Sequence, residues 1–264
     1  MTSLMAAVEG IGVLGPGLEN WLSTAAVLTG TRGYEPARTV LPVPHALPGA
    51  ERRRAGRIIK LALAVGAEAV AQAGRPAQYL PSVFASSGGD GDNCHEICSA
   101  LTEPERSISP TRFHNSVHNA AAGYWSIANG CMEGSVTLCA YDGSFAAGLL
   151  EALSQVAQSR GPVLLVAYDS DYPPPLQRHR PIPDAFGLSL LLAPVDSPRA
   201  LATLRAGLSQ QPATRLAQPA LEALRLAIPA ARGLPLLECL ARGGAGVAAL
   251  DYLDTARLGL EIGA

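Results

Sequence analysis

The chain has 264 residues, of which 48% are hydrophobic and 16% are charged, so it can bury a substantial core and is not a disordered protein. Its formal net charge of −2 excludes the broad basic field that binds nucleic acid through the phosphate backbone. We expect no membrane span, because no run of about 18 apolar residues occurs, and no secretory signal. Five cysteines without regular spacing indicate reduced thiols and a cytoplasmic protein.

An apolar strand over residues 5–8 opens the chain, and we expect it to end in a glycine-rich turn over residues 10–17. Three glycines there fit the spacing of a dinucleotide-binding loop, namely Gly10, Gly12 and Gly15. Pro16 and Gly17 interrupt the helix that should follow, and no acidic residue ends a second strand about 20 residues on. A dinucleotide site is therefore disfavoured, and the sequence predicts no cofactor.

The next two segments are a proline-rich crossing and a long helix. Residues 31–50 hold four prolines and are predicted to be irregular, because proline fits neither a ladder nor a helix interior. Residues 51–73 are predicted to form a helix with a broad apolar face that ends at Gly74. Four arginines crowd its first turns, namely Arg52, Arg53, Arg54 and Arg57. They are interpreted either as a solvated helix face or as a docking patch for an acidic protein or a phosphate.

Strands and helices alternate through the rest of the chain. We expect strands over residues 81–86, 134–140, 161–168 and 185–194, and helices over residues 94–101, 116–129, 144–159, 219–226 and 235–241. Residues 201–208 are expected to pair with the strand before them, and residues 246–252 and 256–262 fit either helix or strand. This alternation predicts an α/β fold with a mostly parallel or mixed sheet that is covered on both faces.

Two groups of side chains have the residue types of a metal site or an acid–base site. Cys94, His95 and Cys98 share a helical turn, but no second pair of ligands completes a zinc site, so no metal is predicted. His114 and His118 fit either an acid–base role or packing with satisfied hydrogen bonds.

The sharp turn between the strand over residues 134–140 and the helix over residues 144–159 is the most promising site. The N-terminus of a helix lowers the pKa of a nearby thiol and can stabilise an oxyanion. Cys139 is the nearest thiol, yet strand alternation places it inside the strand rather than at the turn. It is interpreted either as a structural strand residue or as a nucleophile that works with His114 or His118.

Several segments, in their order and spacing, resemble the N-terminal half of a β-ketoacyl synthase. They are the glycine-rich opening, the arginine-headed helix, the run NAAAGYWSI over residues 119–127, and the turn that contains Gly143. The resemblance implies a thiolase-like half, a layered α/β/α unit with a mixed five-stranded sheet. We expect residues 1–264 to form a single ketosynthase-like domain in which residues 1–195 match the family's N-terminal half and residues 196–264 are a divergent C-terminal extension.

Two departures from the family decide the expected activity. The family's nucleophilic cysteine stands three residues before the turn glycine, where this chain has Ala140. The family's catalytic histidines come from a second half of the chain, and here no histidine follows His179. A decarboxylating condensation needs both parts. We therefore expect no catalytic residue and no condensing activity in the chain alone.

A half-length synthase without its nucleophile resembles the chain-length-factor subunits of type II polyketide systems, above all the short form of aryl polyene pigment clusters. The resemblance implies a heterodimer with a full-length, active ketosynthase, which works on acyl carrier protein thioesters. The factor helps to bound the tunnel into which the acyl chain grows. Two other functions stay open: a small acyltransferase or thioesterase-like enzyme that uses Cys139, and a docking scaffold for carrier proteins.

The same resemblance suggests which residues meet the partner. Phe113 is expected either to stop the acyl chain by excluded volume or to pack in the interface. The other tunnel or interface candidates are His114, His118, Asn119 and Tyr124. The helix over residues 119–127 and the strand over residues 134–139 are candidates for the contact between subunits, and the arginines at 52, 53, 54 and 57 are candidates for docking the carrier protein.

Overall fold

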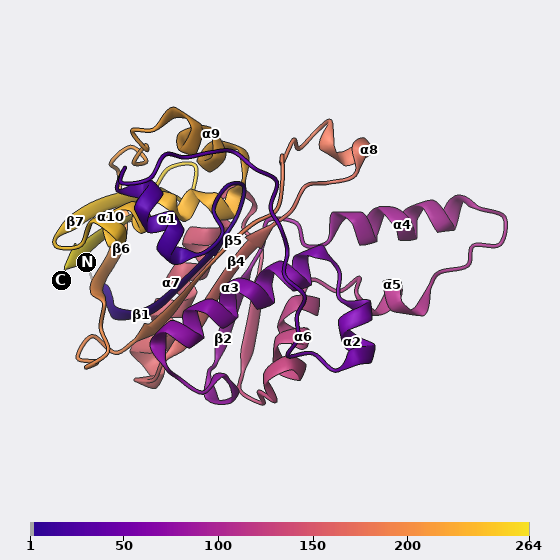
Figure 1. Ribbon diagram of the computed structural model, residues 1–264, viewed down its shortest axis with the longest axis horizontal. Helices are drawn as coiled ribbons and strands as arrows, with labels where there is room; N and C mark the ends of the chain where they lie inside the picture. Colours follow the sequence, from indigo (N-terminus) through magenta and orange to yellow (C-terminus); the bar gives the residue numbers. More distant parts are fainter. Residues whose placement is uncertain (1–2, 264) are drawn as a thin grey trace.

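The computed structural model describes residues 3–263, which form one mixed sheet with helices on both faces (Figure 1). The strand order is β3-β2-β4-β5-β1-β6-β8-β7. β2 runs parallel to β3 and β4, whereas all other neighbouring strands are antiparallel. The strands are β1 (Leu4–Leu14), β2 (Ser82–Ala85), β3 (Ser135–Leu138), β4 (Val163–Asp169), β5 (Phe186–Ala193), β6 (Ala202–Ser209), β7 (Gly246–Asp251) and β8 (Arg257–Gly263).

The sheet has eight strands rather than the five expected. The first five in spatial order, from β3 to β1, are the mixed sheet that the resemblance implies, and residues 196–264, expected to be a C-terminal extension and called so below, add β6, β8 and β7. Residues 201–208 were expected to pair with the strand before them, but β6 pairs with β1 instead. The reason is that both edges of β5 are already taken, one by β4 and one by β1.

β1 continues through Gly10 and Gly12, which were expected to lie in a turn, and ends at Leu14. A Cβ atom on Gly10 would lie 2.0 Å from the carbonyl oxygen of Ala69, and one on Gly12 would lie 2.1 Å from that of Val65. These glycines therefore let helix α3 (Arg57–Ala73) pack directly on the strand backbone. The spacing of Gly10 and Gly12 reflects this close packing, and the expected turn is confined to residues 15–18, where Gly15 and Leu18 exchange two backbone hydrogen bonds.

Helices cover the sheet in two layers. On β4, Leu164 and Val166 face the layer of α3 and α6 (Ala120–Asn129), whereas Leu165 faces the layer of α7 (Ser144–Ser159). Trp125 of α6 packs on α3 at Gly66, where a Cβ atom would lie 2.8 Å from the indole ring. The remaining helices are α1 (Trp21–Leu28), α2 (Gly49–Arg54), α4 (Gly91–Thr102), α5 (Pro110–His114), α8 (Pro174–Gln177), α9 (Pro219–Ala227) and α10 (Leu234–Arg242), with short 3-10 turns η1 (Ala77–Tyr79), η2 (Tyr141–Gly143) and η3 (Pro229–Gly233).

Most helix predictions are confirmed, with shifts at their ends. The helix expected over residues 51–73 is broken into α2 and α3 at Ala55 and Gly56, and it ends at Gly74, whose φ of 62° is left-handed. The short helix α5 lies in a stretch for which the sequence predicted no helix. Together α4 and α5 form an arm, residues 90–116, that projects from the body of the molecule (Figure 1).

The C-terminal extension packs on the sheet as an integral layer. α10 and η3 bury Leu234, Leu236 and Leu237 in the same core as α7, so this segment covers part of the apolar face. The two segments that fitted either helix or strand are strands, because β7 and β8 pair with each other and extend the sheet. No helix within residues 3–263 is long and apolar enough to cross a membrane.

Candidate functional site

The elbow that joins β3 to α7 has a strained backbone. Tyr141 has a φ of 51°, a left-handed conformation that side-chain-bearing residues adopt infrequently. The hydroxyl oxygen of Ser144 accepts a hydrogen bond from the Ala140 N–H group at 3.0 Å and donates one to the Tyr141 carbonyl at 2.7 Å. Ser144 therefore holds the elbow in its strained shape and occupies the backbone donor at the position of the expected nucleophile.

Cys139 lies just after β3, with its thiol turned toward the loop after β2. Its Sγ donates to the carbonyl oxygen of Ser87 across 3.1 Å. Because a carbonyl only accepts hydrogen bonds, the thiol is the donor in this contact. Among residues 3–263, no histidine is hydrogen-bonded to this thiol.

His118 contacts the same loop from the arm side. A Cβ atom on Gly89 would lie 3.2 Å from the His118 ring, and the buried Nε2 atom of His118 has no hydrogen-bond partner within the described residues. His118 and Cys139 therefore both flank the loop over residues 87–89. His114, by contrast, is exposed and packs edge-on against Tyr124, with 6.2 Å between ring centroids.

Asp169, at the carboxyl end of β4, is the buried anchor beneath this loop. Its carboxylate accepts hydrogen bonds from the N–H and hydroxyl of Ser87, at 2.8 and 2.7 Å, and from the Ala230 N–H at 2.9 Å. Burial raises the pKa of Asp169 to about 6, against the lowering effect of these hydrogen bonds. One carboxylate thus ties the loop over residues 87–89 to the C-terminal extension.

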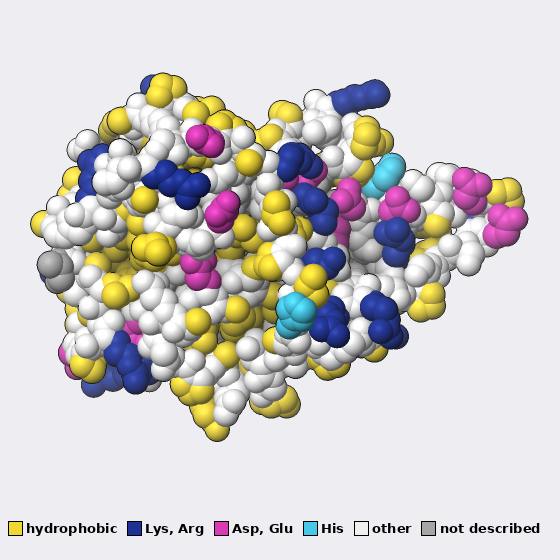
Figure 2. All heavy atoms as spheres, in the orientation of Figure 1, with side chains coloured by type: hydrophobic (Ala, Val, Ile, Leu, Met, Phe, Trp, Pro, Cys, Tyr) yellow, Lys and Arg dark blue, Asp and Glu magenta, His cyan; other side chains and the backbone are white. Residues whose placement is uncertain are grey.

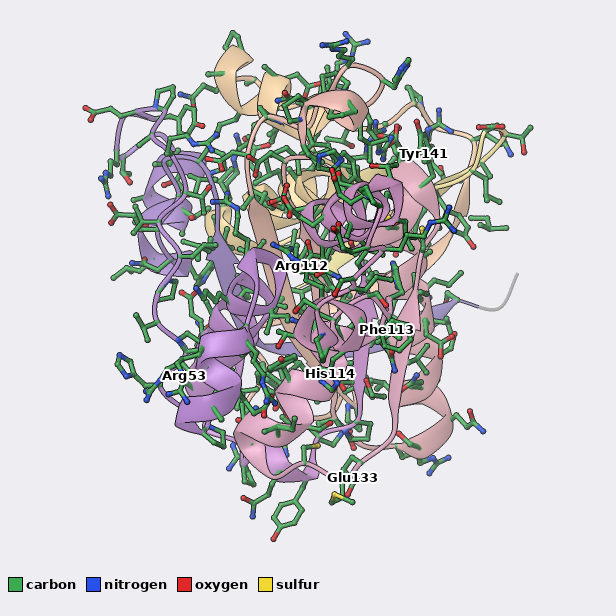
Figure 3. All side chains as sticks on the ribbon, turned by 90° about the vertical axis from the view of Figure 1, so that its right-hand side faces the viewer. Arg53, Arg112, Phe113, His114, Glu133 and Tyr141 are labelled. Atoms are coloured by element: carbon green, nitrogen blue, oxygen red, sulfur yellow. The ribbon has the colours of Figure 1, made fainter. Side chains whose placement is uncertain are left out.

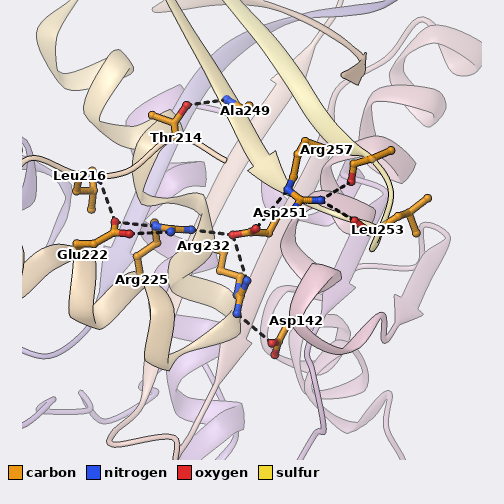
Figure 4. A network of polar contacts seen from close by, with 11 residues as sticks. Asp142, Thr214, Leu216, Glu222, Arg225, Arg232, Ala249, Asp251, Leu253 and Arg257 are labelled. Atoms are coloured by element: carbon orange, nitrogen blue, oxygen red, sulfur yellow. Dashed lines mark hydrogen bonds and ion pairs between the residues drawn. The ribbon is translucent and has the colours of Figure 1, made fainter. Parts of the chain in front are cut away.

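A network of ion pairs also holds Asp142 of the elbow (Figure 4). Asp142 accepts from Arg180 at 2.7 Å and from Arg232 at 3.0 Å. Arg232 also pairs with Asp251 at 3.1 Å, and Arg225 pairs with the same carboxylate at 2.7 Å. The C-terminal extension therefore reaches the elbow through charged hydrogen bonds, which are about twice as strong as neutral ones.

Apolar side chains are exposed along the end of the molecule where the arm projects. Phe113 on α5 is 69% exposed and Met132 is 95% exposed. Figure 3 shows Phe113, Arg112 and Tyr141 on this side. We call this surface the arm-side patch; its residues are Phe113, Val117, Ile127, Met132, Val136 and Tyr141. It borders β3, which is the last strand on this side of the sheet and has a half-exposed surface.

The other tunnel or interface candidates are not all at the surface. Tyr124 is buried against α3, and its hydroxyl donates to the Asn115 side chain at 3.1 Å. Asn115 in turn donates to the Arg54 carbonyl oxygen at 2.9 Å. Tyr124 therefore positions the base of the arm. Asn119 is exposed at the start of α6 and makes no capping hydrogen bond with its side chain.

The four arginines at the start of the predicted helix have different surroundings. Arg57 donates to Asp171 at 3.1 Å and to Asp184 at 3.3 Å, and Arg54 pairs with Glu51 at 2.9 Å. Within residues 3–263, no carboxylate lies at ion-pair distance from Arg52 or Arg53. Only the latter two therefore keep their full charge available on this surface, where Figure 2 shows Lys and Arg side chains gathered.

Sequence reasoning missed the residues that hold the elbow, namely Ser144, Arg180 and Arg232. The Asp-Gly pair at Asp142 indicated a turn, but its partners lie 38 and 90 residues further along the chain. No local pattern encodes such contacts. Among residues 3–263 there is also no group of three or more His, Cys, Asp or Glu side chains that could hold a metal ion.

Comparison with known proteins assigns this architecture. The family model described as "Beta-ketoacyl synthase, N-terminal domain" matches residues 26–235. The chain belongs to the β-ketoacyl synthase N-terminal domain family. No curated protein matches its sequence significantly.

Solved structures share the fold of this β-ketoacyl synthase family member at low identity. The ketosynthase ApeO in complex with its chain length factor ApeC, from Xenorhabdus doucetiae, matches with a TM-score of 0.74 and 21% identity over 97% of this chain and 99% of that chain. The ishigamide ketosynthase/chain length factor gives 0.72 and 14% over 98% and 99%. AntDE:AntF, a type II polyketide synthase acyl-carrier protein in complex with its ketosynthase, gives 0.77 and 10% over 100% of both chains. The fold is therefore the thiolase-like fold of ketosynthases.

Proposed function

We propose that the chain is a chain-length-factor subunit, a ketosynthase-like protein without condensing activity that pairs with a full-length, active β-ketoacyl synthase. The elbow carries the proposal. Ala140 has no nucleophilic atom, and its N–H group is taken by Ser144. The condensation also needs histidines that stabilise the enolate and its oxyanion. The partner would supply all of these groups.

The arm-side patch and the edge of β3 support a protein partner on this side. An edge strand presents unpaired N–H and C=O groups that a second strand can complete. Exposed aromatic and aliphatic side chains next to such an edge are typical of an interface core. Phe113 and Tyr141 are the aromatic side chains of the patch, and aromatic side chains dominate the binding energy of many interfaces.

Phe113 is proposed as the residue that limits the acyl chain. It projects from α5 into solvent in the isolated subunit, so a partner seated on the patch would bury it. His114, His118 and Asn119 lie on the same stretch of chain and would line the same contact. Tyr124 would act through α5, because its hydroxyl holds Asn115.

Arg52 and Arg53 are proposed to contact an acyl carrier protein while the partner acts on it. Their charges are not neutralised by carboxylates of the described residues, unlike those of Arg54 and Arg57. Long-range attraction to an acidic protein depends on such free charges and weakens with salt. The proposed setting is chain elongation in the cytoplasm, for a polyene or polyketide such as an aryl polyene pigment.

Co-expression with a full-length β-ketoacyl synthase tests the proposal. We expect a one-to-one complex by affinity pull-down and native mass measurement, and elongation of malonyl units by the complex but by neither chain alone. A chain that never captures the synthase, or that only captures carrier protein, would favour the docking scaffold instead.

A second function, a small acyltransferase or thioesterase-like enzyme, has one observation in its favour. Cys139 and the unpartnered Nε2 atom of His118 both lie next to the loop over residues 87–89. A small acyltransferase or thioesterase-like enzyme would need Cys139 as a thiolate. We expect Cys139→Ala to leave elongation by the complex unchanged, and the thiol to alkylate no faster near pH 7 than the exposed Cys98 does. Loss of elongation with intact folding and pairing would support the enzyme.

A further inference from the structure

A groove on the α3–α6 side has no role in the proposed function. It has a volume of about 540 Å³, within the range of small-molecule sites. α3 and α6 form its floor, the end of β1 closes one side, and the proline-containing segment over residues 40–46 forms the outer wall. Figure 2 shows hydrophobic side chains gathered over α3 in this region.

Apolar side chains of the wall stay exposed although a groove to receive them lies alongside. Val40 is 80% exposed. Val43, which lies between Pro42 and Pro44, is 57% exposed. The two prolines restrict the backbone of this wall, so the groove is held open in advance of any ligand. Solvated valines at the mouth of a preformed apolar groove would be buried by an apolar ligand.

One end of the groove, at Lys60, favours a single negative charge. Lys60, the single lysine of the chain, lines it on α3 and has no carboxylate at ion-pair distance within residues 3–263. Trp125 lines the floor, is 1% exposed, and has an indole N–H group without an acceptor. Its benzo edge lies against Gly66, so the N–H edge points away from α3 at that position.

Two carboxylates restrict the ligand further. Glu68, two turns after Lys60 on α3, accepts from the N–H groups of Val13 and Trp21 at 2.9 and 2.6 Å, and Glu19 lines the same end. Glu68 lies about 12 Å along the helix from Lys60, from the rise of 1.5 Å per residue. Acidic groups at one end and one ammonium group at the other disfavour a doubly charged phosphate, which arginine clusters bind better.

We propose that this groove binds an amphipathic monocarboxylate of medium chain length, with its carboxylate on Lys60 and its hydrocarbon chain along α3 toward Ala64 and Ala67. The chain would cover Val40 and Val43, and the carboxylate would supply the counter-charge that Lys60 lacks. The groove lies on the helical layer opposite α7, away from the elbow, and its floor shares α6 with the arm-side patch.

Decanoate is the test ligand and decanol its uncharged counterpart. Equilibrium dialysis with the full chain is expected to show saturable one-to-one binding of decanoate and weaker binding of decanol. In a Trp21→Phe background Trp125 is the sole tryptophan, so its fluorescence reports whether the ligand enters this groove. Binding without a change in Trp125 emission would place the ligand elsewhere and overturn the proposal.

Two variants locate the charge and the chain. Lys60→Met is expected to weaken decanoate about tenfold and to leave decanol unchanged, since a charged hydrogen bond is lost. Ala67→Leu fills the groove and is expected to weaken both ligands. Arg178→Met, an exposed cation outside the lining and without a role in the proposed function, is the matched control. Equal decanoate affinity in Lys60→Met and the unchanged chain would overturn the proposal, and native mass measurement of ketosynthase pairing in the same variants keeps this result separate from the proposed function.

Discussion

At the scale of single residues, the chemistry depends on which atoms are missing and which are already bonded. Ala140 offers a methyl group where a nucleophile is expected, and Ser144 takes its N–H group. Cys139 has a thiol, but that thiol donates to Ser87. The side chains that can contact other molecules are those that stay exposed, above all Phe113 on the arm.

Phe113 is expected to set product length. In the complex with the ketosynthase, Phe113→Ala should lengthen the product by at least one elongation, because the space of the ring becomes available, and Phe113→Trp should shorten it. Mass spectrometry of the products measures this. Leu101→Ala, also exposed on the arm, is the control and should leave the product unchanged. If the product length is unchanged in both Phe113 variants while pairing stays normal, Phe113 does not set the chain length and only packs in the interface.

Asp169 is expected to lower the free energy of unfolding as the pH rises, the opposite of what most carboxylates do. Its pKa is about 6 in the folded chain because of burial, above the ordinary value of 3.8. The folded state therefore holds the proton more tightly, and this contribution to stability is full below pH 4 and is lost as the pH rises through 6. The difference corresponds to about 3 kcal/mol.

Urea unfolding of the unchanged chain and of Asp169→Asn at pH 4 and pH 7 measures this contribution. Asparagine cannot titrate, so the stability advantage of the unchanged chain should be up to about 3 kcal/mol larger at pH 4 than at pH 7. An advantage that is equal at both values, or larger at pH 7, would show that Asp169 titrates near its ordinary range.

At the scale of elements, the C-terminal extension holds the elbow. Arg232 lies on η3 and Asp251 at the end of β7, and together they connect to Asp142 on η2. Gly143 permits this docking, because a Cβ atom there would lie 2.3 Å from the Tyr252 carbonyl oxygen. The strained Tyr141 is thus stabilised by elements from the far end of the chain.

Asp142→Ala is expected to loosen this junction. It removes the shared partner of Arg180 and Arg232, and hydrogen bonds to charged groups contribute about 1.5 to 3 kcal/mol each in favourable sites. We expect the free energy of unfolding to fall by about 2 kcal/mol, and hydrogen exchange to rise in η2 and η3. Glu96→Ala, which removes a more exposed pair with Arg112, is the control and should change stability by less than about 1 kcal/mol.

At the scale of the whole molecule, the two ends of the sheet differ. β7 ends one side, and Thr214 covers part of its edge by bonding to the N–H and C=O groups of Ala249. β3 ends the other side next to the arm-side patch. The molecule therefore has one sheet end with a partial cover and one that is suited to a partner.

The chain expressed alone is expected to self-associate through β3 and the arm-side patch. Val136→Lys should shift the population toward monomer, because a lysine on an edge strand opposes pairing with a second strand. The same change should weaken capture of the ketosynthase. Light scattering over a range of concentrations measures both the unchanged chain and the variant. If the unchanged chain is already a monodisperse monomer, the expected self-association is contradicted.

Much of the fold was determined by local sequence. The helix over residues 144–159 has the predicted bounds, and the strands over residues 163–169 and 186–193 lie within a residue or two of the prediction, because apolar periodicity and glycine punctuation act over short range. The order of these elements was also sufficient to indicate the ketosynthase family and to place Ala140 at the elbow.

The tertiary structure decided what depends on distant partners. The glycines of β1 fit a nucleotide-binding loop by their spacing. In the structure, however, the α3 backbone lies so close to them that no side chain would fit there. β6 has the pattern of a strand, and only the open edge of β1 decides its neighbour. Asp142 and Asp169 meet partners 90 and 61 residues away, and a contact of that kind forms only when packing brings the two segments together. Local propensity chooses helix or strand, whereas burial and pairing across the folded chain choose the contacts.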